Sequence, residues 1–394
     1  MTRTFEGRET RVSLVESFID ATASAHAVAV IFSANPIHDT GGGQRSAQLA
    51  LELLARDWCV CFVSRGEVTE TVDLGLRYPY PLLVQASLGD FLTALRGGAL
   101  DETLDRHRVL LVTQIPVAEW LPVIRRVGRH GGVYVYDCVD RWDSELGYGW
   151  YRIRAERRVA RASDMLVASA PALARHLEEL TGRPAHLLPN AFNSKIFRMG
   201  AGTARPSDFP EGNAVALYVG GLWRGCLDWD LVSQTAEALP DIRFVFVGDH
   251  RGEGGSLPPN CHFLGLKAQS DLPGYLSHAR AGFLPWCSDS VTQATSPLKI
   301  YEFLAMGLPV VTPALESLRG IPGVVPASSP DAFIAAVETL VRDGVDGPTR
   351  KAMSAFTAQN SWVNRVDELI RWAGEVPSRP EEPRIVAWLR GFGT

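Results

Sequence analysis

The sequence has no excess of basic residues, no paired-cysteine motif and no metal-ligand spacing. Its 394 residues include six cysteines, none in a CxxC pair, and nine histidines that are not spaced with them as zinc ligands would be. This cysteine usage predicts a reducing compartment and argues against a structural zinc site. The formal net charge of −5 argues against nucleic acid as the main partner.

Long apolar runs are also missing. The first 26 residues lack the continuous apolar core of a signal peptide, and no run approaches the roughly 18 apolar residues of a membrane span. We therefore expect a cytoplasmic protein. One segment, 150–163 (WYRIRAERRVARAS), is strongly basic. We interpret it as a solvated helix face. The alternative is a membrane-surface patch, which would make the protein peripheral to the inner face of the membrane.

The size of the chain predicts two domains, because a single hydrophobic core rarely grows beyond about 250–300 residues. Hydrophobic residues make up 46% of the sequence and charged residues 21%. This balance is typical of a globular protein with large buried sheets.

Short apolar runs alternate with amphipathic stretches such as 44–57 along the whole chain. The first set of expected strands lies at 27–35, 58–64, 109–114, 132–137 and 164–169. The second set lies at 214–221, 242–249, 261–266, 281–286 and 308–313. Strands that alternate with helices in this way indicate parallel sheets.

Between the two sets, residues 190–214 lose this periodicity and accumulate Gly, Pro, Ser and Asn, as a linker does. The predicted fold class is α/β, with two Rossmann-like doubly wound domains that face each other across a cleft. We expect one domain at 1–200, a second at 201–372, and a tail at 373–394 that returns to the first domain. In such sheets ligands bind beyond the carboxyl ends of the strands.

The segment 294–317 (ATSPLKIYEFLAMGLPVVTPALES) predicts a short helix followed by a buried strand. Ser296 is expected to be the N-cap and Pro297 the first helical residue. The helix should run to about Met306, where Gly307 can adopt the left-handed conformation.

The start of this helix is a candidate anion site. The N–H groups of Leu298, Lys299 and Ile300 have no intrahelical acceptors, and the Lys299 ammonium adds a full positive charge. Glu302 lies one turn further on. A nucleoside diphosphate with its ribose would satisfy this set of groups. The alternative is an ordinary capped helix with a Lys–Glu surface that faces solvent.

The same segment resembles the donor-binding signature of GT-B glycosyltransferases of the family 4-like group. Where that group has a pattern of the form sPlKlyEylAaGkPVV, this chain has SPLKIYEFLAMGLPVV. Four other segments support the resemblance: TGGGQR at 40–45, VYVYDCVDRW at 133–142, LLPNAFNSKIF at 187–197 and YVGGLWRGCLDWDLV at 218–232. The resemblance covers nearly the whole chain.

The resemblance implies sugar transfer in polysaccharide or glycoconjugate biosynthesis. The second domain would hold a nucleoside-diphosphate sugar and the first an unidentified acceptor, which could be a glycan, a lipid-linked molecule or a small molecule. It implies that Glu302 binds the donor ribose, that Ser296 and the helix start hold phosphate, and that Lys299, with Arg224, neutralises the diphosphate leaving group. The implied donor-binding residues are Gly42, Gly43, Gly221, Arg224, Ser296, Pro297, Leu298, Lys299 and Glu302. The expected reaction needs neither a metal nor a cofactor, because fixed cations and N–H dipoles stabilise the leaving diphosphate.

The chain departs from the family pattern at two places. The family has a second Glu eight positions before Glu302, where this chain has Ala294, so a carboxylate near the donor sugar is missing. The family often has a Lys after the first Gly of the second domain, and here Arg224 is the nearest cation. Three rival hypotheses remain: an inactive GT-B partner subunit, a nucleotide-sugar epimerase and a sugar phosphorylase on the same fold.

Three residues are candidates for the catalytic machinery. Lys299 would act on the leaving group. Asp137 and Asp140 lie where the strand at 132–137 meets its loop, so one of them is expected to face the reacting sugar or to act as a base on the acceptor hydroxyl. The alternative is that each is a loop carboxylate that caps the next turn.

Weaker candidates have plainer interpretations. Asp228 and Asp230 resemble a metal-binding DxD pair, but Asp228 is better explained as a helix N-cap with Asp230 in the first turn, so no metal site is predicted. His38 is expected to be a turn residue. Ser46 replaces the third Gly of a dinucleotide-binding fingerprint. The tryptophans near loop ends, which would stack on sugars or pack in the core, are Trp142, Trp223 and Trp286.

Overall fold

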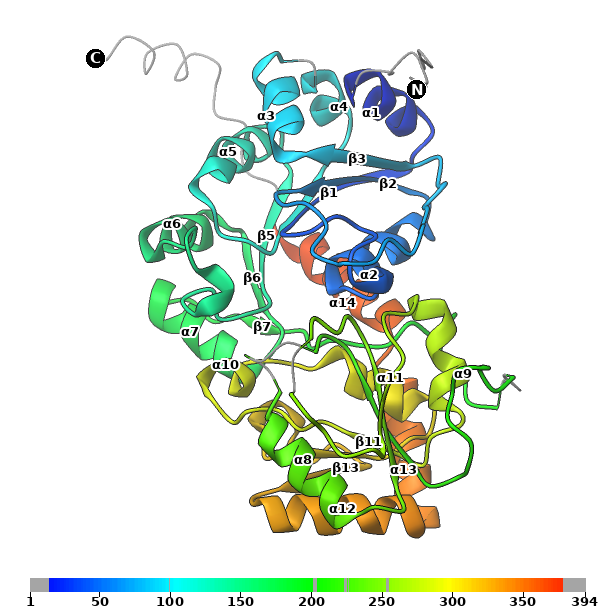
Figure 1. Ribbon diagram of the computed structural model, residues 1–394. Coiled ribbons are helices and arrows are strands. Elements are labelled where there is room, and N and C mark those ends of the chain that lie inside the picture. Colours follow the sequence, from blue (N-terminus) through cyan, green and yellow to red (C-terminus); the bar gives the residue numbers. More distant parts are fainter. Residues whose placement is uncertain are drawn as a thin grey trace, which may run out of the picture.

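The computed structural model describes residues 14–98, 100–200, 204–222, 225, 227–252 and 255–377. Two parallel sheets, each with helices on its faces, form two lobes (Figure 1). The predicted α/β fold class is confirmed.

The first sheet has seven strands in the order β3-β2-β1-β4-β5-β6-β7, all paired in parallel. Its strands are β1 (Ala27–Ser33), β2 (Trp58–Ser64), β3 (Leu83–Ser87), β4 (Leu110–Thr113), β5 (Val133–Cys138), β6 (Met165–Ala168) and β7 (His186–Leu187). Its helices are α1 (Leu14–Ala23), α2 (Arg45–Leu54), α3 (Leu88–Arg96), α4 (Asp101–Arg106), α5 (Leu121–Arg129), α6 (Ile153–Ala162) and α7 (Pro171–Thr181), with short 3-10 turns η1 (Thr40–Gly42), η2 (Ala118–Trp120) and η3 (Glu145–Gly147). The strand order reverses between β1 and β4, which is where such sheets bind ligands.

The second sheet has six parallel strands in the order β10-β9-β8-β11-β12-β13. Its strands are β8 (Val215–Val219), β9 (Arg243–Val247), β10 (Cys261–Phe263), β11 (Ala281–Phe283), β12 (Val310–Pro313) and β13 (Val324–Ala327). The helical elements that follow the linker are α8 (Trp229–Ala238), η4 (Gln269–Asp271), α9 (Leu272–Leu276), α10 (Ser290–Gln293), α11 (Leu298–Ala305), η5 (Glu316–Leu318), α12 (Pro330–Arg342), α13 (Gly347–Ala358) and α14 (Trp362–Glu375).

The central strands are apolar because both of their faces are covered by helices. Every residue of β5 is buried, and so is every residue of β8. Cys59 and Cys61 on β2 are both buried and so belong to the packed core. All ten predicted strands are found. The strands that the sequence did not predict, β3, β7 and β13, lie at sheet edges; β3 and β13 are partly buried, and both residues of β7 are exposed.

The last described helix, α14, lies beside α2 of the first domain (Figure 1). Trp362 is fully buried within the apolar cluster that includes α2 and β1. The chain crosses back next to the outgoing linker: the Phe192 N–H donates to the Asn360 carbonyl at 3.3 Å, and the Trp362 N–H donates to the Phe192 carbonyl at 3.0 Å. The return therefore begins at Ser361. The expected start of the tail, residue 373, falls inside α14, and the tail from 378 lies outside the described residues.

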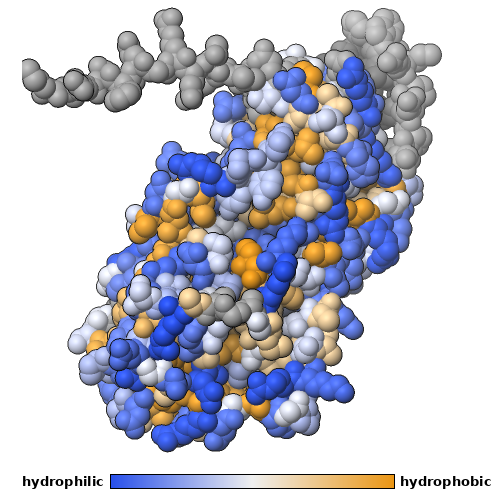
Figure 2. Space-filling model, turned by 90° about the vertical axis from the view of Figure 1, so that its right-hand side faces the viewer, coloured by the Kyte–Doolittle hydropathy of each residue, from blue (hydrophilic) through white to orange (hydrophobic). Residues whose placement is uncertain are grey.

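Polar residues cover much of the face shown in Figure 2, with apolar residues between them. Among the helices of the described part of the chain, none has the length and apolar character needed to cross a bilayer.

Candidate active site

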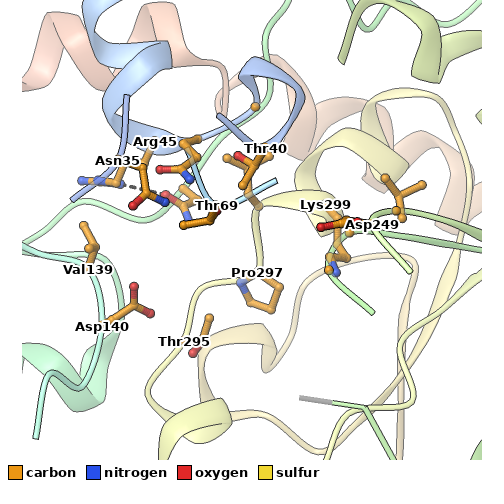
Figure 3. Close-up of a pocket in the computed structure, with 18 of the residues that line it drawn as sticks. Asn35, Thr40, Arg45, Thr69, Val139, Asp140, Asp249, Thr295, Pro297 and Lys299 are labelled. Carbon is orange, nitrogen blue, oxygen red and sulfur yellow. Dashed lines mark hydrogen bonds between the residues drawn. The ribbon is translucent and has the colours of Figure 1, made fainter. Parts of the chain in front are cut away.

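A cleft of about 690 Å³ lies between the two lobes. Its first-domain wall comes from the ends of β1 and β5 and from the turn before α2, and its second-domain wall comes from the ends of β8 and β9 and from the start of α11. These are carboxyl ends of parallel strands, as the sequence analysis expected. In Figure 3, Asp140 and Lys299 lie on different sides of the open space, with Thr295 and Pro297 between them in this view.

The start of α11 is one residue later than predicted. Pro297, with φ −67° and ψ 114°, is the N-cap, and Leu298 is the first helical residue. Ser296 does not cap the helix, because Pro297 is itself extended, so the helix begins one residue further on, and the Ser296 hydroxyl group is used elsewhere. The Ser296 Oγ accepts the Asn190 N–H at 3.3 Å and lies 3.4 Å from the Tyr301 hydroxyl. The predicted left-handed Gly307 is confirmed, with φ 75°.

Lys299 lines the cleft and is held by aromatic side chains. Its Nζ donates a hydrogen bond to the Tyr218 hydroxyl at 2.9 Å, and it lies 4.1 Å from the centre of the Tyr218 ring and 5.1 Å from that of Trp286. The Tyr218 hydroxyl donates in turn to the Gly221 carbonyl at 2.9 Å. These contacts fix the ammonium at the wall of the cleft, where a developing negative charge would be stabilised. The expectation that the Ile300 N–H has no acceptor is wrong, because this group donates to the Pro297 carbonyl at 3.2 Å.

Glu302 is buried, with 3% of its surface exposed, and its side chain borders the same cleft. Gln269 Nε2 donates to Glu302 Oε1 at 2.7 Å. Burial raises the pKa of this carboxyl group to about 7, although the Gln269 hydrogen bond and the Lys299 charge act in the opposite direction.

Asp137 lies behind the wall of the cleft, in a buried ion pair. Its two carboxylate oxygens accept Arg45 Nε and Nη2, each at 2.8 Å, and Gln114 Nε2 donates to Oδ2 at 3.0 Å. Arg45 Nη1 also donates to the Asn190 side chain at 3.1 Å. Asp137 therefore has its hydrogen-bonding capacity occupied by the protein.

Asp140, three residues later, lines the cleft and points into the open space (Figure 3). It is partly exposed, and the loss of water around it raises the pKa of its carboxyl group to about 7. Trp142 and Leu146, from the loop that follows, line the cleft as well. A carboxylate that titrates near neutral pH in a cleft suits proton transfer.

The glycines near the cleft have two roles. Gly43 and Gly221 line the cleft as expected. Gly41 and Gly42 instead allow close packing: a Cβ on Gly41 would lie 2.6 Å from the Lys267 carbonyl oxygen, and one on Gly42 would lie 2.3 Å from the Tyr78 hydroxyl. The first of these contacts joins the two domains.

Several other predicted residues can be placed. Asp228 is the N-cap of α8, where its side chain accepts the Leu231 N–H at 2.9 Å, so that prediction is confirmed. Trp286 borders the cleft, whereas His38 is not among its lining residues. Arg224 and Trp223 lie outside the described residues. Within the described ranges, His, Cys, Asp and Glu side chains do not gather in a group of three that could hold a metal ion.

Other polar residues line the cleft that the sequence did not predict. Asp249 follows β9 and accepts hydrogen bonds from Arg251 Nε at 2.9 Å and from the hydroxyl group of Thr71, a residue of the first domain. Glu70 also lines the cleft, and burial together with the nearby Asp39 raises the pKa of its carboxyl group to about 7. Asp249 gave a signal in the sequence, because it is an acid at the end of the predicted strand 242–249. The position of Glu70, in a loop with no regular structure, gave no such signal.

Residues 214–343 match the family model described as "Glycosyl transferases group 1". Over 264 residues the chain is 24% identical to TuaH of Bacillus subtilis (strain 168), which is named as a teichuronic acid biosynthesis glycosyltransferase; the match covers 61% of this chain and 66% of TuaH. Over 179 residues it is 26% identical to the UDP-glucuronate:glycolipid 2-beta-glucuronosyltransferase of Xanthomonas campestris pv. campestris, covering 43% of this chain and 40% of that protein. The chain thus spans less than two thirds of the length of each of these relatives.

Solved structures show the same two-domain arrangement. Anabaena HepE in complex with UDP and glucose matches with a TM-score of 0.65 and 15% identity, over 89% of this chain and 100% of HepE. Sucrose-phosphate synthase from Thermosynechococcus elongatus matches with a TM-score of 0.62 and 17% identity, over 88% of this chain and 98% of the synthase. The fold is GT-B, and the resemblance to GT-B glycosyltransferases is confirmed.

Proposed function

We propose that this protein transfers a hexose-type sugar from a nucleoside diphosphate to an acceptor held by the first domain. The observation that carries the proposal is the start of α11, where Lys299 and Glu302 border one cleft with Asp140 of the first domain. A cation and first-turn N–H groups suit a diphosphate, and a carboxylate suits the ribose hydroxyl groups. UDP is the first nucleotide to test, because HepE has been solved in complex with it.

The proposed reaction needs no metal and no cofactor. As the bond to the sugar breaks, negative charge grows on the departing diphosphate, and Lys299 with the N–H groups of α11 would stabilise it. On the acceptor side, Asp140 is the better candidate for the base, because Asp137 is already paired with Arg45. Asp140 would take the proton of the attacking hydroxyl group when it lies within hydrogen-bond reach.

The position of the family's second Glu is buried in this chain. Ala294, which stands in its place, is 1% exposed and belongs to the apolar core cluster of the first domain. A carboxylate here would be buried among apolar side chains, which is costly. Alanine at position 294 therefore fits the packing of this chain. The absence of the carboxylate is also consistent with the hypothesis of an inactive partner subunit.

Thermal unfolding with UDP, GDP, dTDP and ADP, with and without EDTA, tests the donor site. A ligand at about a hundred times its Kd adds about 2.7 kcal/mol to the free energy of unfolding. We expect one nucleotide to stabilise the native chain, with and without EDTA, and to have a much weaker effect on Glu302→Ala. Stabilisation that EDTA abolishes would contradict metal independence. No stabilisation by any nucleotide would favour the partner subunit.

Product analysis then separates the rival activities. A transferase releases free nucleoside diphosphate and adds the mass of one sugar to the acceptor. An epimerase converts one nucleotide sugar into another, and a phosphorylase needs inorganic phosphate. Conversion of the donor without release of its nucleotide would contradict the proposed transfer.

We also propose that the protein binds peripherally to the inner face of the membrane. Arg154, Arg157, Arg158 and Arg161 of α6 follow helical spacing and are exposed, and no described residue pairs with them. Arg125 and Arg129 are exposed on α5, which packs beside α6 (Figure 1). We call these six side chains the arginine face.

Apolar side chains lie next to the arginine face in sequence: Tyr148 is 89% exposed, Ile153 44% and Leu146 42%. Arginines with exposed apolar residues suit an anionic bilayer surface, at about 1 kcal/mol per charge. Sedimentation with phosphatidylglycerol vesicles should remove native protein from solution, and Arg157→Glu/Arg158→Glu should reduce this binding strongly. The matched control is Arg342→Glu on α12. Equal binding to neutral phosphatidylcholine vesicles would contradict the proposal.

A further inference from the structure

A continuous chain of buried side-chain hydrogen bonds joins the linker, the first domain and the second domain. Asn193 Nδ2 donates to Gln48 Oε1 at 2.9 Å, and Gln48 Nε2 donates to Gln269 Oε1 at 2.9 Å. Gln269 Nε2 then donates to Glu302 Oε1 at 2.7 Å. The four residues are between 0% and 6% exposed, so water competes little for these bonds. We call Asn193, Gln48, Gln269 and Glu302 the amide chain.

Backbone groups at one end fix the direction of the amide chain. The Lys195 N–H can only donate, and it donates to Asn193 Oδ1 at 3.0 Å. The Gly42 carbonyl can only accept, and it accepts from Gln48 Nε2 at 2.9 Å. The Asn193 amide therefore has to offer its NH₂ group to Gln48, and Gln48 has to offer its own NH₂ group to Gln269.

The direction of the amide chain determines which group of the Gln269 side chain faces Glu302. Because Gln269 accepts from Gln48 with its oxygen, its NH₂ group is left for Glu302. Gln269 thus presents a donor to one carboxylate oxygen, Oε1, and leaves Oε2 for a ligand in the cleft. The rotamer of Gln269 is set by Gln48, which belongs to the other domain.

We propose that Gln48 and Gln269 are positioning residues that aim the Glu302 carboxylate at the donor. Through them, α2 of the first domain controls how tightly the second domain binds a nucleotide. The inference rests on the proposed function, since it assumes that the nucleotide binds at Glu302.

The amide chain also affects protonation. The hydrogen bond from Gln269 stabilises the ionised carboxylate and so lowers the pKa of Glu302 against the effect of burial. Of the groups around Glu302, Gln48 and Gln269 do not ionise, Arg45 on α2 is paired with Asp137, and Lys299 is the charge that also lowers this pKa. When Gln269 is free to turn, the pKa of Glu302 should rise, and less carboxylate should be present at pH 7.

The test uses Gln48→Leu, which removes the hydrogen-bonding groups at similar volume, and Gln269→Ala as a second variant in case the first does not fold. Gln85→Leu, at an exposed position on β3, is the matched control. Each chain is titrated with UDP, GDP, dTDP and ADP between pH 6 and pH 9. We expect the Kd of the bound nucleotide to rise about tenfold at pH 7 in Gln48→Leu, the effect of one lost hydrogen bond, and to approach the native value at pH 9.

A double-mutant cycle with Glu302→Gln separates positioning from a general structural effect. If Gln48 acts through Glu302, Gln48→Leu should change the Kd little in the Glu302→Gln background. An equal loss in both backgrounds, or a loss that does not change with pH, would overturn the inference and leave the proposed function intact. Failure of the native chain to bind any of the four nucleotides would overturn the proposed function and the inference with it.

Discussion

The Arg45 guanidinium group binds both carboxylate oxygens of Asp137, each at 2.8 Å, with both side chains almost completely buried. Arg45 lies on α2 and Asp137 at the end of β5, so the pair joins two elements that meet at the carboxyl edge of the first sheet. Arg45 Nη1 also donates a hydrogen bond to Asn190 Oδ1. Asn190 Nδ2 in turn donates to the Ser296 carbonyl at 2.6 Å. The pair thus supports the loop that leads into α11.

Asp137→Asn should destabilise the protein by about 3–5 kcal/mol, because it leaves a buried arginine without its counter-charge. Denaturant unfolding measures the loss. The control is Glu338→Gln, which breaks the exposed pair with Arg342 and should cost at most about 1 kcal/mol. Unchanged stability together with abolished transfer would show instead that Asp137 takes part in the reaction.

Asp140→Asn should lower kcat about a hundredfold and leave nucleotide binding unchanged, because the side chain faces the acceptor side of the cleft. The base must be ionised, and its pKa is raised to about 7, so native kcat should rise with pH through this value. The variant should lose this rise. The control is Asp143→Asn, since Asp143 is paired with Arg141. A native rate that is flat between pH 6 and pH 8 would argue against Asp140 as the base.

Glu302→Gln should stabilise the unliganded protein at pH 8 while it weakens nucleotide binding. The native fold raises the pKa of Glu302 from 4.5 to about 7, so it favours the protonated form. The contribution of this group to stability is therefore present below pH 4.5 and is lost as pH rises to about 7. The stability of the variant relative to native should increase by about 3 kcal/mol between pH 4.5 and pH 8. The same difference at both pH values would show that burial does not hold Glu302 protonated.

Gly220→Ala should impair turnover by moving Lys299. Gly220 has φ 130°, and a Cβ there would lie 2.4 Å from Lys299 Nζ. The ammonium group would have to leave its place over Tyr218, and we expect kcat to fall by about a hundredfold. The control is Gly182→Ala, which has φ 74° and no atom within 4 Å of the added Cβ, so it tests backbone strain alone. Equal activity of the two variants would contradict the proposed place of Lys299.

The interior of the fold could be predicted from the sequence because its strands are continuous apolar runs. The edge strands escaped prediction for different reasons: β3 has mixed composition, β7 has only two residues, both exposed, and β13 is apolar but contains a proline, which argues against a strand. At the start of α11, the sequence suggested Ser296 as the N-cap. Its hydroxyl group is used by Asn190, 106 positions away, and no local pattern contains that contact.

The candidate site was predictable in part. Lys299 and Glu302 were found because they lie on one helix within a dense motif. The residues that hold Glu302 were not found, because Gln48 and Gln269 are 221 positions apart. Asp137 was found as a catalytic candidate, but its pairing with Arg45, 92 positions away, was not. Residues of this kind look like ordinary polar positions of amphipathic helices or loops until the fold brings them together.

The outgoing linker at Phe192 and the returning chain at Ser361 run side by side as a parallel bridge. The two lobes are therefore joined by two adjacent covalent connections, and a protease cut in one of them would leave the other in place. Two connections at one point also act as a hinge, which permits bending about a single line more readily than twisting. Opening about that hinge would separate α2 from the start of α11, so release of the product and loosening of the donor site would occur in one movement.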